Sequence, residues 1–225
     1  MKAVNLLTPE HEHEFEAAHG LPEALPAGET LLWQGSPNAR LMTRQALHFD
    51  LLLVYFGTLV AWSGITAWYD GAALAQTLIA MGRASALFAL ALGLLSGIGW
   101  LIARTSVYTI TDRRIVMRIG VVLSITFNLP FKQIESAAVR RHGKSGAGDI
   151  VLSLGDADRI AYLHLWPHVR PWQLRRTQPM LRALAQADAV AEMLAAALQQ
   201  QAAGSSVRAP ALPVRAVHTG HLQVA

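Results

Sequence analysis

Cysteine is absent from this chain of 225 residues, and charged residues make up only 15% of it. A chain without thiols forms no disulfide, no zinc–thiolate site and no cysteine-ligated iron–sulfur cluster. The charged share is low beside the roughly 25% of an ordinary soluble domain, whereas hydrophobic residues reach 52%. Such a composition excludes a disordered chain, which would be polar and rich in charge. It also indicates that part of the chain lies in a lipid bilayer.

Two long stretches, residues 51–69 and 84–103, contain no charged side chain. At a rise of 1.5 Å per residue, each would span about 30 Å as a helix, which is the thickness of the hydrocarbon layer. Neither stretch has the polar face that a helix of a soluble protein needs. Trp68 and Trp100 lie near their ends, where the membrane interface favours such rings. The sequence therefore predicts two transmembrane helices, at about residues 46–69 and 84–103.

Arginines flank the two stretches. Arg40 and Arg44 precede the first stretch, and four arginines, beginning with Arg104, follow the second before residue 119. Because positive charge is retained in the cytoplasm, we expect both termini on that side. Residues 71–82 between the stretches are apolar but too few to cross a bilayer alone. We expect them to connect the helices along the far interface. The alternatives are that they extend the helices or that they form a third short span, which would move one terminus across the membrane.

Two ionisable residues, His48 and Asp50, lie at the predicted cytoplasmic edge of the first helix. The simplest interpretation is a polar pair that reaches lipid headgroups and water. Ionisable residues within a membrane also mark functional sites, and a histidine at this depth is able to ligate the magnesium of a chlorin pigment. Nothing in the spacing requires such a ligand, and we expect no cofactor.

The rest of the chain divides by composition. Residues 1–45 form an acidic head, with six Glu against one Lys in the first thirty positions and a short helix expected over residues 9–19. The HEHEF sequence in the head lacks the spacing of the HExxH zinc motif, so we expect no metal site. The expected divisions are the head at 1–45, the transmembrane hairpin at 46–103, a β-rich domain with its helix at 104–201, and a flexible tail at 202–225.

The β-rich region contains short segments that alternate in polarity or are rich in β-branched residues. Their spacing leaves no room for crossover helices, so an antiparallel sandwich or barrel is predicted. Residues 143–148 are expected to form a hairpin loop, because the spacing of a Walker loop and its following helix are missing. Apolar residues recur at helical spacing from Met180 to Gln201 and predict a helix. The predicted strands are residues 107–111, 115–119, 121–129, 134–139, 150–154 and 160–165.

Basic and aromatic residues gather after the last predicted strand. Residues 104–176 carry twelve Lys or Arg against five Asp or Glu, which suits a domain beside an anionic membrane surface. No nucleic-acid-binding motif accompanies this charge, and no catalytic motif is recognisable, so we expect neither a nucleic-acid partner nor an enzyme. Tryptophan and arginine dominate the energetics of protein interfaces; alternatively, Trp166 and Trp172 close one end of the barrel. The predicted partner-binding residues are Trp166, His168, Arg170, Trp172, Arg175 and Arg176.

Four segments carry a resemblance to known families. Residues 108–120 (YTITDRRIVMRIG) and 129–135 (LPFKQIE) resemble the bacterial pleckstrin-homology-like (PH-like) domain, with its Thr-Asp-Arg-Arg hairpin, glycine turn and Pro-x-x-x-Ile approach to the next strand. Residues 28–37 (GETLLWQGSP) are similar to the opening that often precedes membrane spans in these proteins. Together with residues 163–167 (LHLWP), the arrangement resembles the photosynthetic-complex assembly proteins encoded beside the reaction-centre H subunit.

This resemblance implies an α+β membrane protein of the bacterial inner, intracytoplasmic membrane. Two transmembrane helices, or three if the apolar connector crosses, would be followed by a cytoplasmic PH-like antiparallel β-barrel or sandwich capped by a C-terminal helix. The implied function is non-enzymatic assembly of the reaction centre–light-harvesting 1 complex in purple phototrophic bacteria. The implied partners are reaction-centre and light-harvesting 1 subunits, other assembly factors, membrane lipids and a second copy of the chain. A general membrane-anchored PH-like module that organises lipid or envelope proteins is the alternative.

Overall fold

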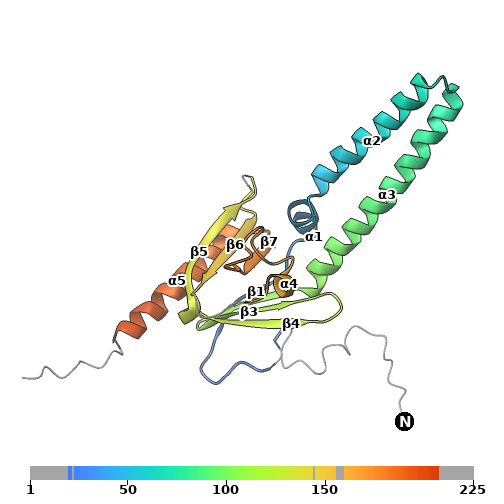
Figure 1. Ribbon diagram of the computed structural model, residues 1–225. Helices are drawn as coiled ribbons and strands as arrows, with labels where there is room; N and C mark the ends of the chain where they lie inside the picture. The colour runs from blue at the N-terminus through green and yellow to red at the C-terminus, as the bar shows by residue number, and fades with distance from the viewer. Residues whose placement is uncertain (1–19, 22, 144, 156–159, 208–225) are drawn as a thin grey trace, which may run out of the picture.

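The computed structural model describes residues 20–207 apart from 22, 144 and 156–159. Two long helices project as a hairpin from a β-rich domain (Figure 1). The expected helix at residues 9–19 and the part of the expected tail from residue 208 onward lie outside the described residues.

The hairpin consists of α2 (Phe49–Tyr69) and α3 (Leu74–Thr105), which pack against each other. Gly64 allows close approach, since a Cβ there would lie 2.6 Å from the sulfur of Met81. Both helices are long and apolar enough to cross a membrane. The protein buries none of the apolar window of α2 and 17% of that of α3, whereas a core helix of a soluble protein would be mostly buried. The hairpin therefore presents an apolar surface that the chain itself leaves uncovered.

The connection between the two helices is shorter than the sequence predicts. Helix α3 begins at Leu74, so residues 74–82 extend it and do not lie along an interface. Gly71 takes a positive φ of 78° and turns the chain immediately after α2. Residues 74–82 contain no proline and only one glycine, so nothing interrupts the helix once it has started. Within the described residues, two helices rather than three are long and apolar enough to cross a membrane.

The first membrane helix also begins later than residue 46. A short helix, α1 (Ala39–Leu41), and a π-helical turn, η2 (Met42–Ala46), precede it. His48 then adopts a left-handed conformation, with φ of 53°, which separates this segment from α2. Met42 is fully buried against Ile102 of α3 and Ala183 of the β domain. The α1–η2 segment thus docks the hairpin onto the β domain.

The β domain contains two antiparallel sheets around one core, to which both contribute side chains. Helix α5 (Ala187–Val207) contacts strands of the second sheet. The prediction of antiparallel sheets is confirmed, but a closed barrel is wrong, because strand pairing between the two sheets is not found among the described residues. The first sheet contains the strands β1 (Leu31–Gly35), β2 (Val107–Thr111), β3 (Arg114–Ile119) and β4 (Ile125–Pro130). A short 3-10 turn, η3 (Phe131–Gln133), leads to the second sheet. The second sheet contains the strands β5 (Ile134–Arg141), β6 (Gly148–Leu154) and β7 (Met180–Leu184).

Four assignments made from the sequence need correction. The predicted strand at residues 121–129 begins only at Ile125, because residues 121–123 form the turn after β3. Strand β1 comes from the expected acidic head and pairs with β2, so residues 31–35 belong to the β domain. The segment predicted as a strand at 160–165 contains the helix α4 (Tyr162–Leu165). The predicted helix from Met180 begins only at Ala187, because residues 180–184 form the last strand beside β6 and are buried there. That helix also continues past Gln201 to Val207.

A buried chain of hydrogen bonds joins the end of α3 to the β domain. The Tyr108 hydroxyl accepts from the Arg182 backbone N–H at 3.1 Å. It also forms a hydrogen bond with Nδ1 of His168 at 2.5 Å, and Nε2 of the same ring lies 3.1 Å from Ser106 Oγ. Burial, together with the nearby Arg182 charge, lowers the pKa of His168 to about 3. The ring is therefore neutral, and one of its nitrogens donates while the other accepts.

A second buried group fixes β7 beside the α1 segment. The Asp149 carboxylate accepts from the Ala183 backbone N–H at 2.8 Å and from Nε2 of His142 at 2.9 Å. Ala183 has a positive φ of 56°, and its carbonyl accepts from the Asn38 N–H at 2.8 Å. Asn38 in turn caps α1 through its side chain. A strained residue is therefore held by hydrogen bonds on both sides, which ties β7 to the start of the membrane segment.

The buried His168 should make stability depend on pH. Its pKa is near 6.5 when unfolded and about 3 when folded, so between these values the unfolded state binds one more proton. Stability is then greatest above pH 6.5 and falls as the pH drops, by about 1.4 kcal/mol per pH unit. Thermal unfolding in detergent, followed by circular dichroism from pH 4 to 7.5, measures this slope. His168→Gln should lower stability at pH 7 but flatten the slope; an unchanged slope would contradict the assignment.

Candidate partner-binding surfaces

The basic aromatic segment of the sequence forms a loop that is closed at its base. Val169 and Pro179 form a β-bridge. The Arg170 N–H donates to the Gln178 carbonyl at 3.0 Å, and the Met180 N–H donates to the His168 carbonyl at 2.9 Å. These bonds hold the ends of residues 170–178 together, which we call the basic aromatic loop.

The basic aromatic loop exposes large apolar side chains next to cations. Trp172 is 93% exposed and Leu174 is 68% exposed, and the neighbouring Arg175 is exposed as well. Trp172 also has a positive φ of 65°, which is unusual for a bulky side chain. Tryptophan beside arginine is the composition of an interface hot spot. The loop is therefore the surface of the β domain best suited to bind another protein.

The six predicted partner-binding residues do not all lie on this surface. Trp166 is 54% exposed and lies just before the loop. Arg170 donates to Gln178 Oε1 at 2.9 Å and so helps to close the base. His168 is buried in the hydrogen-bonded chain described above, which contradicts its predicted role at a surface. The exposure of Trp166 and Trp172 also excludes the alternative that they close one end of a barrel; Arg175 and Arg176 are exposed on the loop.

The base of the loop lies beside the lower end of α3. His168, which precedes the loop, has its ring nitrogen Nε2 3.1 Å from Oγ of Ser106, the residue that follows α3. Strand β7 then runs from Met180, beside Val151, to Leu184, opposite Gly148. Ala183, near the end of this strand, bonds to Asn38 at the start of α1. The start of β7, where the loop ends, therefore lies near the end of α3, and the other end of β7 contacts α1.

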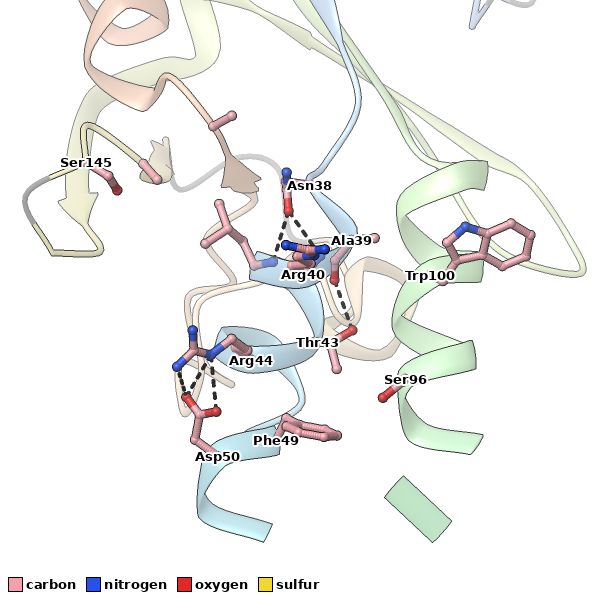
Figure 2. A pocket seen from close by; sticks show the side chains of 13 residues that line it. Asn38, Ala39, Arg40, Thr43, Arg44, Phe49, Asp50, Ser96, Trp100 and Ser145 are labelled. Carbon is pink, nitrogen blue, oxygen red and sulfur yellow. Dashed lines mark hydrogen bonds and ion pairs between the residues drawn. The ribbon is translucent and has the colours of Figure 1, made fainter. Parts of the chain in front are cut away.

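A cavity of about 690 Å³ lies at the junction of the hairpin and the β domain. Its wall combines the α1–η2 segment, the first turn of α2, one side of α3 and the turn between β5 and β6. Figure 2 shows Arg44 and Asp50 facing each other on one side of this segment, with Ser96 and Trp100 on the other. Aromatic and aliphatic side chains next to arginines suit an amphiphile such as a lipid. The lining residues are Asn38, Ala39, Arg40, Leu41, Thr43, Arg44, Phe49, Asp50, Ser96, Trp100, Ser145, Ala147 and Ala185.

The sequence predicts a polar pair of His48 and Asp50 at the start of α2, but the structure pairs Asp50 with Arg44. Asp50 pairs with Arg44, whose Nε lies 2.9 and 3.1 Å from the two carboxylate oxygens. His48 is exposed at the kink before α2. The ion pair cancels two charges where an apolar helix begins. Among the described residues, no group of three or more His, Asp or Glu side chains is placed to hold a metal ion.

The outer surface of the hairpin contains small residues that the chain does not use. A Cβ at Gly93 or Gly97 would meet no atom within 4 Å, whereas Gly99 lies directly against Thr43. The Gly93–Gly97 spacing is that of close helix contacts in membranes. The spacing is visible in the sequence, whereas the face on which the two glycines lie is given only by the structure. Arg44 was missed as the partner of Asp50, although its place six positions earlier was a possible signal.

Comparisons with known proteins agree with this architecture. A family model described as "Bacterial PH domain" matches residues 51–198, which is more than half of the chain. The chain is also 35% identical, over 194 residues, to an "Uncharacterized 23.7 kDa protein in puhA 5'region" of Rhodobacter capsulatus; the match covers 84% of this chain and 89% of that protein. No solved structure matches. On the strength of both matches, the chain belongs to the bacterial PH domain family.

Proposed function

We propose that this protein is a membrane-anchored, non-enzymatic assembly factor for the photosynthetic reaction centre and its light-harvesting 1 complex. The observation that carries the proposal is the pairing of an uncovered apolar hairpin with a domain whose basic aromatic loop exposes Trp172 and Leu174. Such a molecule has one surface for client helices in the bilayer and another for client segments in water. Neither surface requires a catalytic group.

The link to photosynthesis rests on sequence similarity. The relative in Rhodobacter capsulatus is named for its position in the 5' region of puhA. The motifs of this chain independently resemble assembly proteins encoded beside the reaction-centre H subunit. The two observations agree on a genetic neighbourhood, and they support reaction-centre and light-harvesting 1 subunits as the clients.

In the proposed mechanism, the protein binds one client at two places at once, within the bilayer and in the aqueous phase beside it. Helices α2 and α3 anchor the chain, and the outward Gly93–Gly97 face of α3 allows close packing of a client helix. The basic aromatic loop, with Trp172 at its most exposed point, binds a cytoplasmic segment of the same client. Arg175 favours an acidic segment by charge complementarity. Binding at both surfaces strengthens the whole complex through effective concentration.

The junction cavity favours a second candidate function, which is the organisation of membrane lipids or envelope proteins by a general PH-like module. Arg40 lines the cavity next to Leu41 and Phe49, which is a suitable environment for a lipid headgroup and its chains. The two candidates differ in what the protein contacts most in the cell, which is a photosynthetic subunit in the first case and lipid or unrelated envelope proteins in the second.

Deletion of the gene should lower the amount of assembled reaction centre without stopping pigment synthesis. Absorbance spectra of isolated membranes measure the complex, and extraction of total pigment measures synthesis. Return of the gene should restore the complex. Equal amounts of assembled complex in the deleted and parent strains would refute the assembly function.

Photocrosslinking should identify the client of the basic aromatic loop. A photoreactive benzoylphenylalanine at Trp172 should crosslink to a reaction-centre or light-harvesting subunit during complex formation. The same group at Lys132, which is exposed in the turn η3, serves as the matched control. Arg175→Glu should reduce the crosslink several-fold, because a charge pair is reversed, while Lys132→Glu should not. Crosslinks to lipid or to unrelated envelope proteins would instead favour the second candidate.

A further inference from the structure

The turn between β3 and β4 carries three consecutive apolar side chains that the fold leaves uncovered. Val121 is 44% exposed, Val122 is 92% exposed and Leu123 is 80% exposed. Turns are ordinarily built from Gly, Asn, Asp and Ser, whose backbones and side chains suit both the geometry and water. We call residues 121–123 the apolar tip.

The backbone holds the apolar tip in this exposed position. Gly120 has a positive φ of 129°, and a Cβ there would lie 2.0 Å from the carbonyl oxygen of Leu123. Only glycine lets the chain fold back so closely. The close approach of Gly120 to Leu123 makes a tight turn with Val122 near its outermost point, so the backbone conformation of the turn accounts for the exposure of Val122.

The apolar tip lies at the end of the sheet where the membrane helix enters. Helix α3 ends at Thr105 and β2 starts at Val107, with a single residue between them. Val107 lies opposite Arg118, close to the end of β3. Strand β3 therefore returns to the level of the helix end, and α3 contacts it. Figure 1 shows the turn after β3 at the lower end of α3.

The lower end of α3 has the residues of a membrane interface. Arg104 lies over the Trp100 ring, 5.3 Å from its centroid. Tryptophan favours the interfacial region of a bilayer, and arginine near an anionic leaflet binds lipid headgroups. Arg83 is the next charged residue along the helix in the other direction. The uncharged stretch of α3 thus ends at the level of the apolar tip.

The packing of the hairpin sets the depth of one apolar stretch against the other. Phe56 stacks on Phe88, with ring centroids 4.6 Å apart, which fixes the register of α2 against α3. In this register the uncharged stretch of α3 extends roughly ten residues, or about 15 Å, closer to the β domain than that of α2. A tilt of the hairpin reduces this difference in depth. The lower end of α3 therefore marks the deepest apolar level on the side of the β domain.

We propose that the apolar tip inserts into the interface of the leaflet that α3 enters, as a third contact with the bilayer besides the two helices. The inference rests on the membrane anchoring in the proposed function and adds a lipid-binding element to it. Val122 and Leu123 lose their contact with water in the lipid, which favours insertion. Because two helices and one turn define a plane, the β domain is held in a fixed orientation relative to the bilayer.

A single fluorescent label tests the insertion, because the natural chain contains no cysteine. The full-length Val122→Cys protein carries an environment-sensitive nitrobenzoxadiazole label in vesicles of phosphatidylcholine and phosphatidylglycerol. Lipids with a nitroxide near the headgroup should quench the label, aqueous iodide should not, and its emission should shift to the blue. Lys132→Cys, near the opposite end of the first sheet, should respond to iodide only. Leu90→Cys on the outer surface of α3 reports whether the hairpin is in the bilayer.

Three results would overturn the proposal. If iodide quenches the Val122 label as strongly as the Lys132 label, the tip lies in water. If nitroxide still quenches the Leu90 label in that case, the hairpin is in the bilayer and only the tip inference has failed. Protection of the Val122 label from both quenchers would mean that protein, either a partner or a second copy, covers the tip. A Leu90 label insensitive to nitroxide would remove the membrane anchor and the tip insertion with it.

Discussion

The uncovered apolar surface of the helical hairpin is the constraint on which the rest of the structure depends. Helix α2 has no charged residue between Asp50 and Asp70, and the chain buries none of its apolar window. An exposed surface of this size is costly in water. A bilayer removes that cost, because helices satisfy their own backbone hydrogen bonds within lipid. The β domain is consequently confined to one end of the hairpin.

A short and well-packed junction carries this constraint into the β domain. Only Ser106 separates α3 from β2, and its hydroxyl forms a hydrogen bond with the buried His168 ring. Met42 packs between α3 and β7, and Gly99 lets Thr43 approach the helix directly. These contacts leave little freedom between helix and sheet. Any surface on the β domain therefore has a defined direction relative to the hairpin, which the proposed scaffold requires.

Local patterns in the sequence were sufficient to predict the elements that pack against their neighbours in the chain. Strands β2 and β3 form a hairpin, and the alternation within residues 107–111 and the turn at Asp112 predicted them. Residues 180–184 were assigned to a helix because five consecutive residues with a mainly apolar pattern fit a buried strand or a helix equally well. The membership of β1 in the first sheet was not predictable, since it pairs with β2 across the whole hairpin.

The candidate surfaces also divide into features that the local sequence predicts and features that depend on residues far away in the chain. The composition of the basic aromatic loop pointed to Trp172 and Arg175, because tryptophan and arginine in one short segment are recognisable without a fold. The burial of His168 was not predictable, because its partners Tyr108 and Ser106 lie about sixty residues away in the sequence. Asp50 was found from its position at a membrane edge, but its pairing with Arg44 depends on the kink at His48.

The most direct test of the membrane-spanning hairpin is cysteine labelling from one side of the membrane. Tyr69→Cys lies at the far end of the hairpin and Leu163→Cys lies on the β domain, and each parent side chain is 85% exposed. In intact cells with a permeabilised outer membrane, a maleimide that cannot cross the inner membrane should label the cysteine at position 69 but not the one at 163, and lysis should make both reactive. Labelling of both positions or of neither before lysis would contradict a hairpin that crosses the bilayer.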